Sequence, residues 1–191
     1  ELGKVFRNEG IDQSHSPEFT MMESYEAYVD VTTVMDMVEN MCTYIFDELG
    51  IEKNIKFMDT EADFSGPWKR VSMYELVSKK FKVDIKHDSD IKKVKRELKK
   101  NLDIKPEAKT VGLLVYELFE NYIEDDITSP TFVTDYPVEV SPFARENKRK
   151  PGVTERFELF AFGSELANGF SELIDSDEQE DKLKAQAEQK A

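Results

Sequence analysis

Residues 156–173 read RFELFAFGSELANGFSEL. Two segments rich in apolar and aromatic residues, 156–162 and 165–173, lie on either side of Gly163, a residue typical of tight turns. This stretch therefore predicts an antiparallel β-hairpin, and the remaining elements can be placed outward from it.

Helical periodicity dominates the chain before this hairpin. Apolar residues recur every three or four positions in segments that predict helices over 32–49, 72–81, 89–102 and 110–126. Gly50 follows the first helix, and Ser72 and Glu75 have the spacing of a capping box at the start of the second. Shorter segments predict strands at 3–7, 19–25, 55–57, 131–136 and 139–141.

This order of strands, helices and strands predicts the fold class. It is typical of an α+β domain with an antiparallel sheet, flanking helices and a helical insertion at about 72–126. The polar tail at 175–191 has almost no apolar residue except Leu183, so in isolation it predicts a frayed or disordered helix.

Composition restricts the functional classes. The 191 residues carry 40 acidic and 26 basic side chains, and this net charge of −14 repels polyanions. Contact with RNA would need a local basic stretch or another domain. The helix at 89–102 is the only dense basic stretch, although a charged outer face is also the default for a surface helix.

A single cysteine, Cys42, fits a reducing, cytoplasmic compartment, and no apolar run is long enough for a membrane span. The chain begins with Glu1 rather than Met, so we expect a segment before it.

Two predicted strands combine acids with aromatic rings on one face. The two-residue period of a strand gives two such groups: Phe19, Met21, Glu23 and Tyr25 on the first strand, and Asn168, Phe170 and Glu172 on the second. Gly169 leaves room beside the second group for a close approach. We expect the two strands to adjoin in one sheet and these groups to share one face, which would suit an organic cation with an apolar stem. Alternatively, these acids line a solvated sheet edge.

Several motifs in order resemble one family. They are FRNEG at 6–10, HSPEFTMME at 15–23, TDYPVEVSP at 134–142, ERFELF at 155–160 and ELANGFSEL at 165–173. Together they resemble class II lysyl-tRNA synthetases from motif 2 to just before motif 3. The resemblance covers essentially the whole chain and implies a partial class II synthetase catalytic domain over residues 1–191.

The resemblance implies a set of ATP contacts. Arg7 would be the catalytic residue, bridging the lysine carboxylate and the ATP α-phosphate. Glu9 and Phe19 would bind adenine by hydrogen bonding and stacking, and His15 would approach the outer phosphates. The expected metal ligands for Mg²⁺ are Glu158 and Glu165.

The resemblance also implies a lysine site. Asn168 would bind the lysine carboxylate, and Phe170 would pack on the aliphatic stem. Glu172 and Tyr25 would meet the ε-ammonium, with Glu23 as a second amine-recognising carboxylate. The implied reaction forms lysyl-adenylate from lysine and ATP and transfers lysine to tRNA(Lys), in a homodimeric cytoplasmic enzyme with no membrane partner.

The sequence also departs from the family. Ser164 stands where the family generally has an arginine, and motif 1, motif 3 and the anticodon-binding barrel are not in the chain, so we expect weak lysine activation by the chain alone. Two alternatives remain open: a paralogue that lysylates a protein, which the helical insertion disfavours, and a non-catalytic binding module. Aspartate or asparagine synthetases share the architecture, but a carboxylate-lined pocket would repel an acidic substrate.

Overall fold

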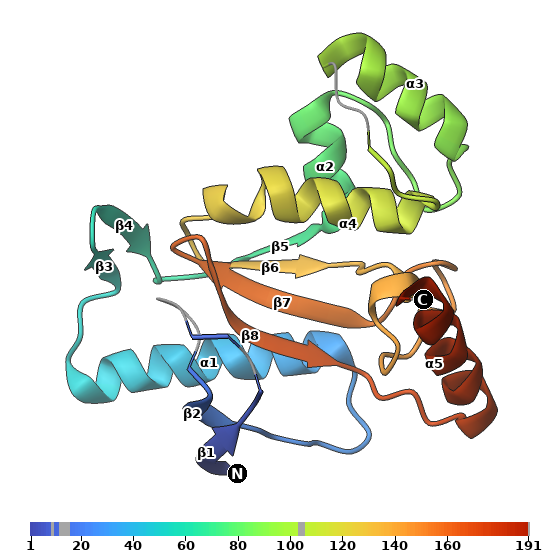
Figure 1. The fold of residues 1–191 in the computed structure, drawn as a ribbon. Coiled ribbons are helices and arrows are strands. Elements are labelled where there is room, and N and C mark those ends of the chain that lie inside the picture. The colour runs from blue at the N-terminus through green and yellow to red at the C-terminus, as the bar shows by residue number, and fades with distance from the viewer. Residues whose placement is uncertain (9, 12–15, 103–105, 191) are drawn as a thin grey trace.

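The computed structural model describes residues 1–8, 10–11, 16–102 and 106–190 (Figure 1). The strands are β1 (Leu2–Phe6), β2 (Glu18–Met22), β3 (Asn54–Phe57), β4 (Thr60–Asp63), β5 (Lys69–Ser72), β6 (Thr131–Thr134), β7 (Arg156–Ala161) and β8 (Ser164–Phe170). The helices are α1 (Val31–Leu49), α2 (Met73–Phe81), α3 (Ile91–Leu102), α4 (Val111–Tyr122) and α5 (Ser176–Lys190), with short 3-10 turns η1 (Glu124–Asp126) and η2 (Val138–Val140). The predicted α+β class is confirmed.

A four-stranded sheet in the order β5-β6-β7-β8 forms the centre of the domain. The β6–β7 and β7–β8 pairs are antiparallel, so the predicted hairpin is confirmed. The β5–β6 pair is parallel, which the expected antiparallel sheet did not include. Because parallel neighbours need a long crossover, helices α2, α3 and α4 lie in the connection between these two strands.

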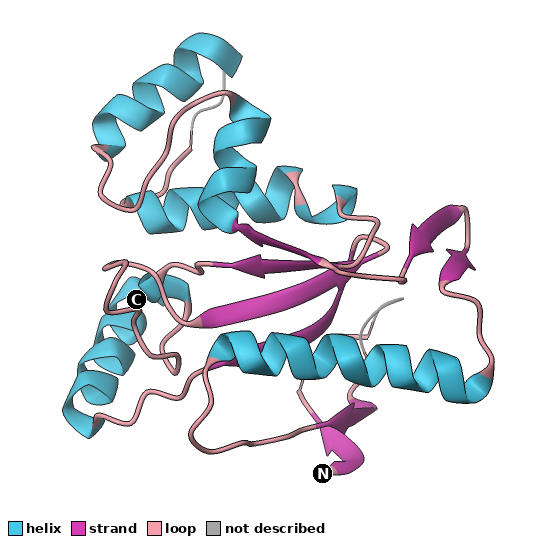
Figure 2. Ribbon diagram, turned by 180° about the vertical axis from the view of Figure 1, so that it is seen from behind, coloured by secondary structure: helices cyan, strands magenta, loops and turns pink. Residues whose placement is uncertain are grey.

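Each face of this sheet is covered by a different apolar core. Helix α1 lies on one face and α4 on the other (Figures 1 and 2). Along β7, Phe157 and Leu159 pack with α1, whereas Phe160 packs with α2 and α4. The alternation of a strand therefore places Glu158 on the side of the helical insertion. The sequence of β7 thus determines which layer the carboxylate faces.

Two glycines permit close approaches around β8. Gly163 makes the turn with φ +69°, and a Cβ there would lie 2.8 Å from the Asp125 carbonyl oxygen. Gly169 lies opposite Phe157, and a Cβ there would lie 2.6 Å from that ring. The close approach expected at Gly169 is thus made by an aromatic ring of the core.

The N-terminal hairpin lies outside the central sheet. Strands β1 and β2 pair only with each other in the described part of the chain, with Val5 opposite Phe19. The predicted single sheet joining residues 19–25 to 165–173 is therefore wrong. Strand β2 also ends at Met22, so the strand period does not extend to Tyr25.

Local sequence explains other boundaries. The Asp30 carboxylate accepts from the Thr33 amide at 3.0 Å at the start of α1, and Gly50 ends the helix in the left-handed conformation. Residues 139–141 were predicted as a strand, but η2 occupies 138–140. Prolines on both sides of this segment, Pro137 and Pro142, limit its ladder hydrogen bonds, which explains the correction.

Candidate active site

Arg156, the first residue of β7, joins two groups of predicted ligands. Its Nε donates to Asn168 Oδ1 at 3.1 Å, and its Nη2 donates to the Glu158 carboxylate. Its Nη1 donates to Ser141 Oγ at 3.0 Å and to a carbonyl oxygen of η2 at 3.1 Å. The guanidinium carbon lies 4.5 Å from the centroid of the Tyr136 ring. With these partners on its planar fork, Arg156 holds one orientation.

Glu158 is a buried carboxylate, with 9% of its surface exposed. The Tyr136 hydroxyl donates to Glu158 Oε2 at 2.7 Å, and Arg156 donates to Oε1. Burial, followed by the Glu158 carboxylate, raises the pKa of Tyr136, so its hydroxyl stays protonated and acts as a donor. Each carboxylate oxygen has a further lone pair, which leaves Glu158 able to bind a cation.

Glu165 lies on β8, across the hairpin from Glu158. Partial burial raises the pKa of Glu165 most, and the Glu158 carboxylate raises it further, whereas Arg156 and Arg7 lower it. These two arginines therefore supply positive charge near Glu165, next to Ser164, where the sequence resemblance leads us to expect an arginine. Two neighbouring carboxylates, Glu158 and Glu165, form a donor set suited to a hard cation such as Mg²⁺.

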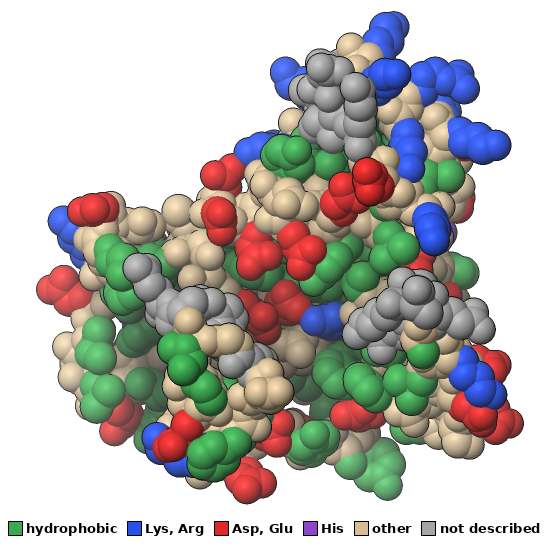
Figure 3. Space-filling model, viewed as in Figure 1, with side chains coloured by type: hydrophobic (Ala, Val, Ile, Leu, Met, Phe, Trp, Pro, Cys, Tyr) green, Lys and Arg blue, Asp and Glu red, His purple; other side chains and the backbone are tan. Residues whose placement is uncertain are grey.

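Helix α4 and the η1 turn contribute further acids to this region. Burial, followed by Glu158, Glu120, Asp125 and Glu165, raises the pKa of Glu124 to about 6. Figure 3 shows acidic side chains gathered in the middle of one face, over the sheet and below α4. Within the described residues, no group of three or more His, Cys, Asp or Glu side chains is arranged to hold a metal ion. A metal would thus depend on two carboxylates together with oxygens of a ligand.

A cavity of about 200 Å³ opens beside Arg156. Its lining includes Asn168 and Phe170, as expected, together with Ser141 and Phe143 from the loop after η2. An amide, an aromatic ring and a cation therefore surround one small volume. This arrangement suits a ligand with a carboxylate and a short apolar stem.

The other predicted lysine ligands lie apart from this cavity. Glu172 is exposed, and its backbone makes an isolated bridge with Ala144. Tyr25 is 81% exposed and Glu23 is also exposed, and both follow the end of β2. None of these three residues lines the cavity. The structure thus brings together Asn168 and Phe170 but not the proposed ammonium ligands.

The predicted ATP ligands of the N-terminal hairpin are partly described. The Arg7 guanidinium carbon lies 5.3 Å from the centroid of the Phe19 ring, and Arg7 Nη2 lies 3.9 Å from Met21 Sδ. Glu9 and His15 lie outside the described residues. Arg7 and Phe19 are thus neighbours, as a shared nucleotide site requires.

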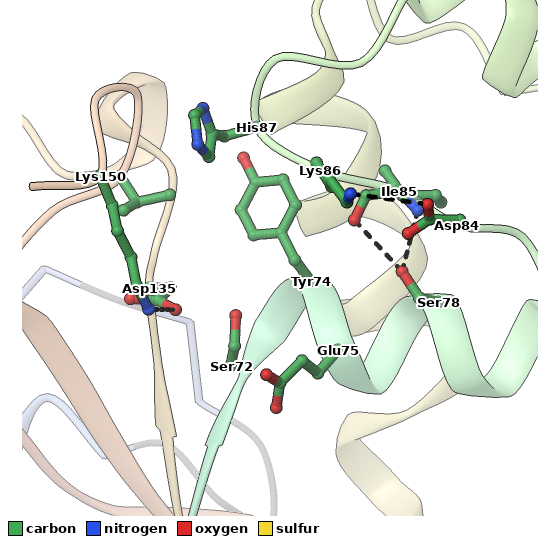
Figure 4. Close-up of a pocket in the computed structure, with 11 residues that line it drawn as sticks. Ser72, Tyr74, Glu75, Ser78, Asp84, Ile85, Lys86, His87, Asp135 and Lys150 are labelled. Carbon is green, nitrogen blue, oxygen red and sulfur yellow. Dashed lines mark hydrogen bonds and ion pairs between the residues drawn. The ribbon is translucent and has the colours of Figure 1, made fainter.

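A larger cavity, of about 360 Å³, lies between the helical insertion and the loop before β7 (Figure 4). Tyr74 points toward His87 there, and Lys150 Nζ is 2.9 Å from Asp135 Oδ2. None of the predicted site residues that the structure describes lines this cavity. It is therefore separate from the candidate site.

Sequence reasoning missed three members of the site. Arg156 precedes Glu158 by two residues, so the strand period could have placed both on one face. Tyr136 lies in the TDYPVEVSP motif, but its hydroxyl direction depends on the turn after β6. No sequence pattern indicated Glu124 as a site residue, because its proximity to Glu158 comes from packing of α4 against the sheet.

Comparison with known proteins places these features in a family. A family profile described as class II tRNA synthetases (D, K and N) matches residues 1–191. A lysine–tRNA ligase of Prochlorococcus marinus is 43% identical over 96% of this chain and 37% of its own length. Those of Parasynechococcus marenigrum and Thermosipho africanus are 44% and 42% identical, over 100% and 98% of this chain and 38% and 37% of their own lengths.

The chain therefore spans somewhat more than a third of the length of these relatives. Within the described residues, no helix combines the length and apolar character that a membrane crossing requires. The match of the family profile over the whole chain is decisive, and the chain belongs to the class II tRNA synthetases of the D, K and N group.

Proposed function

We propose that this chain is the catalytic segment of a lysine–tRNA ligase, which activates lysine with ATP and transfers it to tRNA(Lys). The observation that carries the proposal is Arg156, which joins the carboxylate proposed for the metal, Glu158, to the amide proposed for the amino acid, Asn168. The names of the three relatives support the choice of lysine. The family resemblance further implies a cytoplasmic homodimer.

In this proposal the lysine carboxylate binds beside β8. Asn168 donates from its amide nitrogen to the carboxylate, while Arg156 fixes the amide by holding Oδ1. The aliphatic stem lies against Phe170 in the cavity. Because the carboxylate must attack the α-phosphorus in line with the bond to the departing pyrophosphate, orientation by fixed groups supplies much of the catalysis.

Arg7 is the proposed catalytic residue. Its guanidinium bridges the attacking carboxylate and the α-phosphate, where negative charge accumulates during the displacement. Phe19, whose ring neighbours Arg7, stacks on adenine. Glu9 and His15 are assigned to the adenine amino group and the outer phosphates on the sequence resemblance alone.

Glu158 and Glu165 are the proposed magnesium ligands. Bound there, Mg²⁺ would neutralise charge on the ATP phosphates and relieve the repulsion between the two carboxylates. Tyr136 and Arg156 hold Glu158 in place through its two oxygens. The buried ligand is thus oriented before the ion binds.

Glu172, Tyr25 and Glu23 are the proposed ligands of the ε-ammonium. Carboxylates at this end of the pocket would attract a cation and repel the side chain of an aspartate substrate. Residues 23–25 would have to lie over the β8 end of the cavity in the assembled enzyme. Charge complementarity thus favours lysine over the acidic substrate of the same family group.

A chimera tests the proposal. Residues 1–191 would replace the matching segment of the Prochlorococcus marinus lysine–tRNA ligase, and exchange of pyrophosphate into ATP would be measured with lysine, aspartate and asparagine in turn. We expect exchange that depends on lysine alone. A folded chimera that uses aspartate or asparagine, or that shows no exchange, would reject the proposal.

Two substitutions in the chimera separate the proposed roles. Glu172→Gln keeps the shape but removes the charge, so lysine kcat/KM should fall by at least about 30-fold, the equivalent of about 2 kcal/mol. The KM for ATP should change little. Glu158→Gln should instead weaken the use of Mg-ATP more than lysine binding. Equal losses for both substrates in Glu172→Gln would show that this residue supports the fold rather than lysine recognition.

A further inference from the structure

Helix α3 differs in charge from the rest of the chain. Its 12 residues contain six basic side chains and one acidic side chain, a net charge of +5 in a chain whose total is −14. Five exposed cations form what we call the basic face of α3: Lys92, Lys93, Arg96, Lys99 and Lys100. At about 100° per residue, these five positions cover roughly 120° of the helix circumference with no acid between them.

The opposite side of α3 is anchored to the protein. Val94 is 3% exposed and Leu98 is 0% exposed, and both belong to the core that α2 and α4 share. Figure 1 shows α3 as an outer element of the helical insertion, and Figure 3 shows basic side chains concentrated at that end of the molecule. The basic face is thus held outward on a packed helix.

The cations of this face are not used within the described part of the protein. None of them forms an ion pair with another described residue, whereas Lys53, Lys80 and Lys150 pair with aspartates elsewhere. Five like charges on adjacent turns repel one another, and such repulsion costs stability unless a counter-charge is bound. The face therefore has unused binding capacity for a polyanion.

We propose that the basic face of α3 binds the phosphate backbone of RNA. The choice of RNA rests on the proposed function, in which tRNA is a substrate. A 12-residue helix is about 18 Å long, enough to lie along several backbone phosphates. The contact would be independent of sequence, because the exposed side chains offer charge but no aromatic platform for bases.

The structure favours RNA over two other anionic partners. A membrane surface is normally bound by a helix that inserts its apolar face, but the apolar face of α3 is already buried in the core. Acidic proteins are usually bound through apolar or aromatic anchors surrounded by charge, and the basic face has none. A phosphate backbone needs only cations at regular spacing.

Binding of the intact chain to fluorescein-labelled unfractionated tRNA tests the proposal, with anisotropy measured from 50 to 200 mM KCl and without lysine or ATP. The test variant changes Lys92, Lys93, Arg96, Lys99 and Lys100 to Gln, which preserves helix propensity. The control variant changes five exposed lysines outside α3 to Gln: Lys56, Lys69, Lys79, Lys109 and Lys148. Circular dichroism checks that both variants fold.

Both variants lose five positive charges, so a difference between them measures the basic face of α3 and not the net charge. We expect the test variant to bind at least about 10-fold more weakly at 100 mM KCl. The slope of log K against log salt concentration should also become shallower by about 2 to 4, because each phosphate contact contributes roughly 0.7 to 0.9 to it. The control variant should lose less than about threefold. Equal losses in both variants, unchanged binding in the test variant, or no binding by the parent chain at 50 mM KCl would overturn the proposal. So would α3-dependent binding to phosphatidylserine vesicles without binding to tRNA.

The lysine chimera separates this proposal from the proposed function. The five substitutions lie outside the candidate site, so lysine-dependent pyrophosphate exchange without tRNA should be unchanged. The kcat/KM for tRNA in aminoacylation should fall at least about 10-fold. A chimera without exchange whose tRNA binding still depends on α3 would reject the proposed function alone.

Discussion

The two hairpins that carry the proposed ligands differ in what surrounds them. The β7–β8 hairpin is part of a four-stranded sheet, with Phe157 and Phe160 packed into cores on opposite faces. The β1–β2 hairpin pairs only with itself in the described chain, and its Arg7 is exposed. On the first hairpin, functional groups are fixed by neighbours that also stabilise the fold.

Because of this difference, substitutions in the two hairpins should have different effects on stability and on catalysis. A functional residue held by buried partners, such as Arg156, cannot be changed without disturbing the fold. A functional residue on an exposed hairpin is not part of a buried core, so its loss should affect the reaction more than the fold. Matched substitutions in the two hairpins can therefore test the roles proposed for them.

The largest effect is expected for Arg7→Met in the chimera. Loss of a group that stabilises charge only in the transition state should reduce lysine-dependent exchange about 100- to 1000-fold. The free energy of unfolding should change by no more than about 0.5 kcal/mol, because the side chain is exposed. Exchange kinetics and urea denaturation measure the two effects. A large loss of stability would show that Arg7 has a structural role.

Arg156→Met should have the next largest effect, now on the fold. It leaves the buried Glu158 carboxylate with Tyr136 as its remaining side-chain donor, so unfolding should require about 3 kcal/mol less free energy. Arg156→Lys should recover part of the stability, since it keeps the charge but loses the fork geometry. Urea denaturation of the chain at pH 7.5 measures both variants. A loss below about 0.5 kcal/mol in Arg156→Met would contradict the proposed network.

Two glycines, Gly169 on β8 and Gly3 on β1, allow the two hairpins to be compared again, with a smaller expected effect on stability. Gly169→Ala places a methyl group 2.6 Å from the Phe157 ring, which also packs edge-on against Phe132 and cannot easily move. This overpacking should cost about 2 kcal/mol. Gly3→Ala on β1 meets no heavy atom within 4 Å and should cost nothing measurable. Thermal unfolding of the two variants compares them directly, and equal stability would show that the core around Phe157 is loosely packed.

Much of the fold was predictable because its local signals are strong. The helix predicted at 32–49 is α1 at 31–49, and the predicted hairpin around Gly163 is formed. Strands β4 and β5 were missed because each has four residues and little apolar alternation. Their pairing depends on partners distant in the sequence, such as β6 for β5.

The site was predictable where one strand carries it. Asn168 and Phe170 share the cavity because a two-residue period places them together. Glu23 and Tyr25 were assigned the same period, but their strand ends earlier and belongs to another sheet. Periodicity orders residues within one strand and does not determine which strands become neighbours.

The smallest effect concerns Glu124, which packing places near Glu158 and Glu165. Its pKa is raised to about 6, above that of an ordinary glutamate, so the folded state binds the proton more tightly than the unfolded state. This contribution to stability is present below about pH 4.5 and is lost as the pH rises through 6. The full shift corresponds to about 2 kcal/mol, and solvent screening of the half-buried group reduces it to about 1 kcal/mol.

Glu124→Gln should therefore stabilise the chain at pH 7.5 by about 1 kcal/mol, a rise of roughly 3 °C in Tm, and should have little effect at pH 4. Glu75→Gln, which removes an exposed carboxylate from α2, controls for the change in net charge. A gain that is equal at both pH values would mean that packing, rather than the burial and repulsion of the Glu124 charge, causes it. A gain confined to high pH would show that burial and the neighbouring carboxylates place the ionised Glu124 under electrostatic strain. No such strain is expected at the exposed β1–β2 hairpin, where solvent screens the charges.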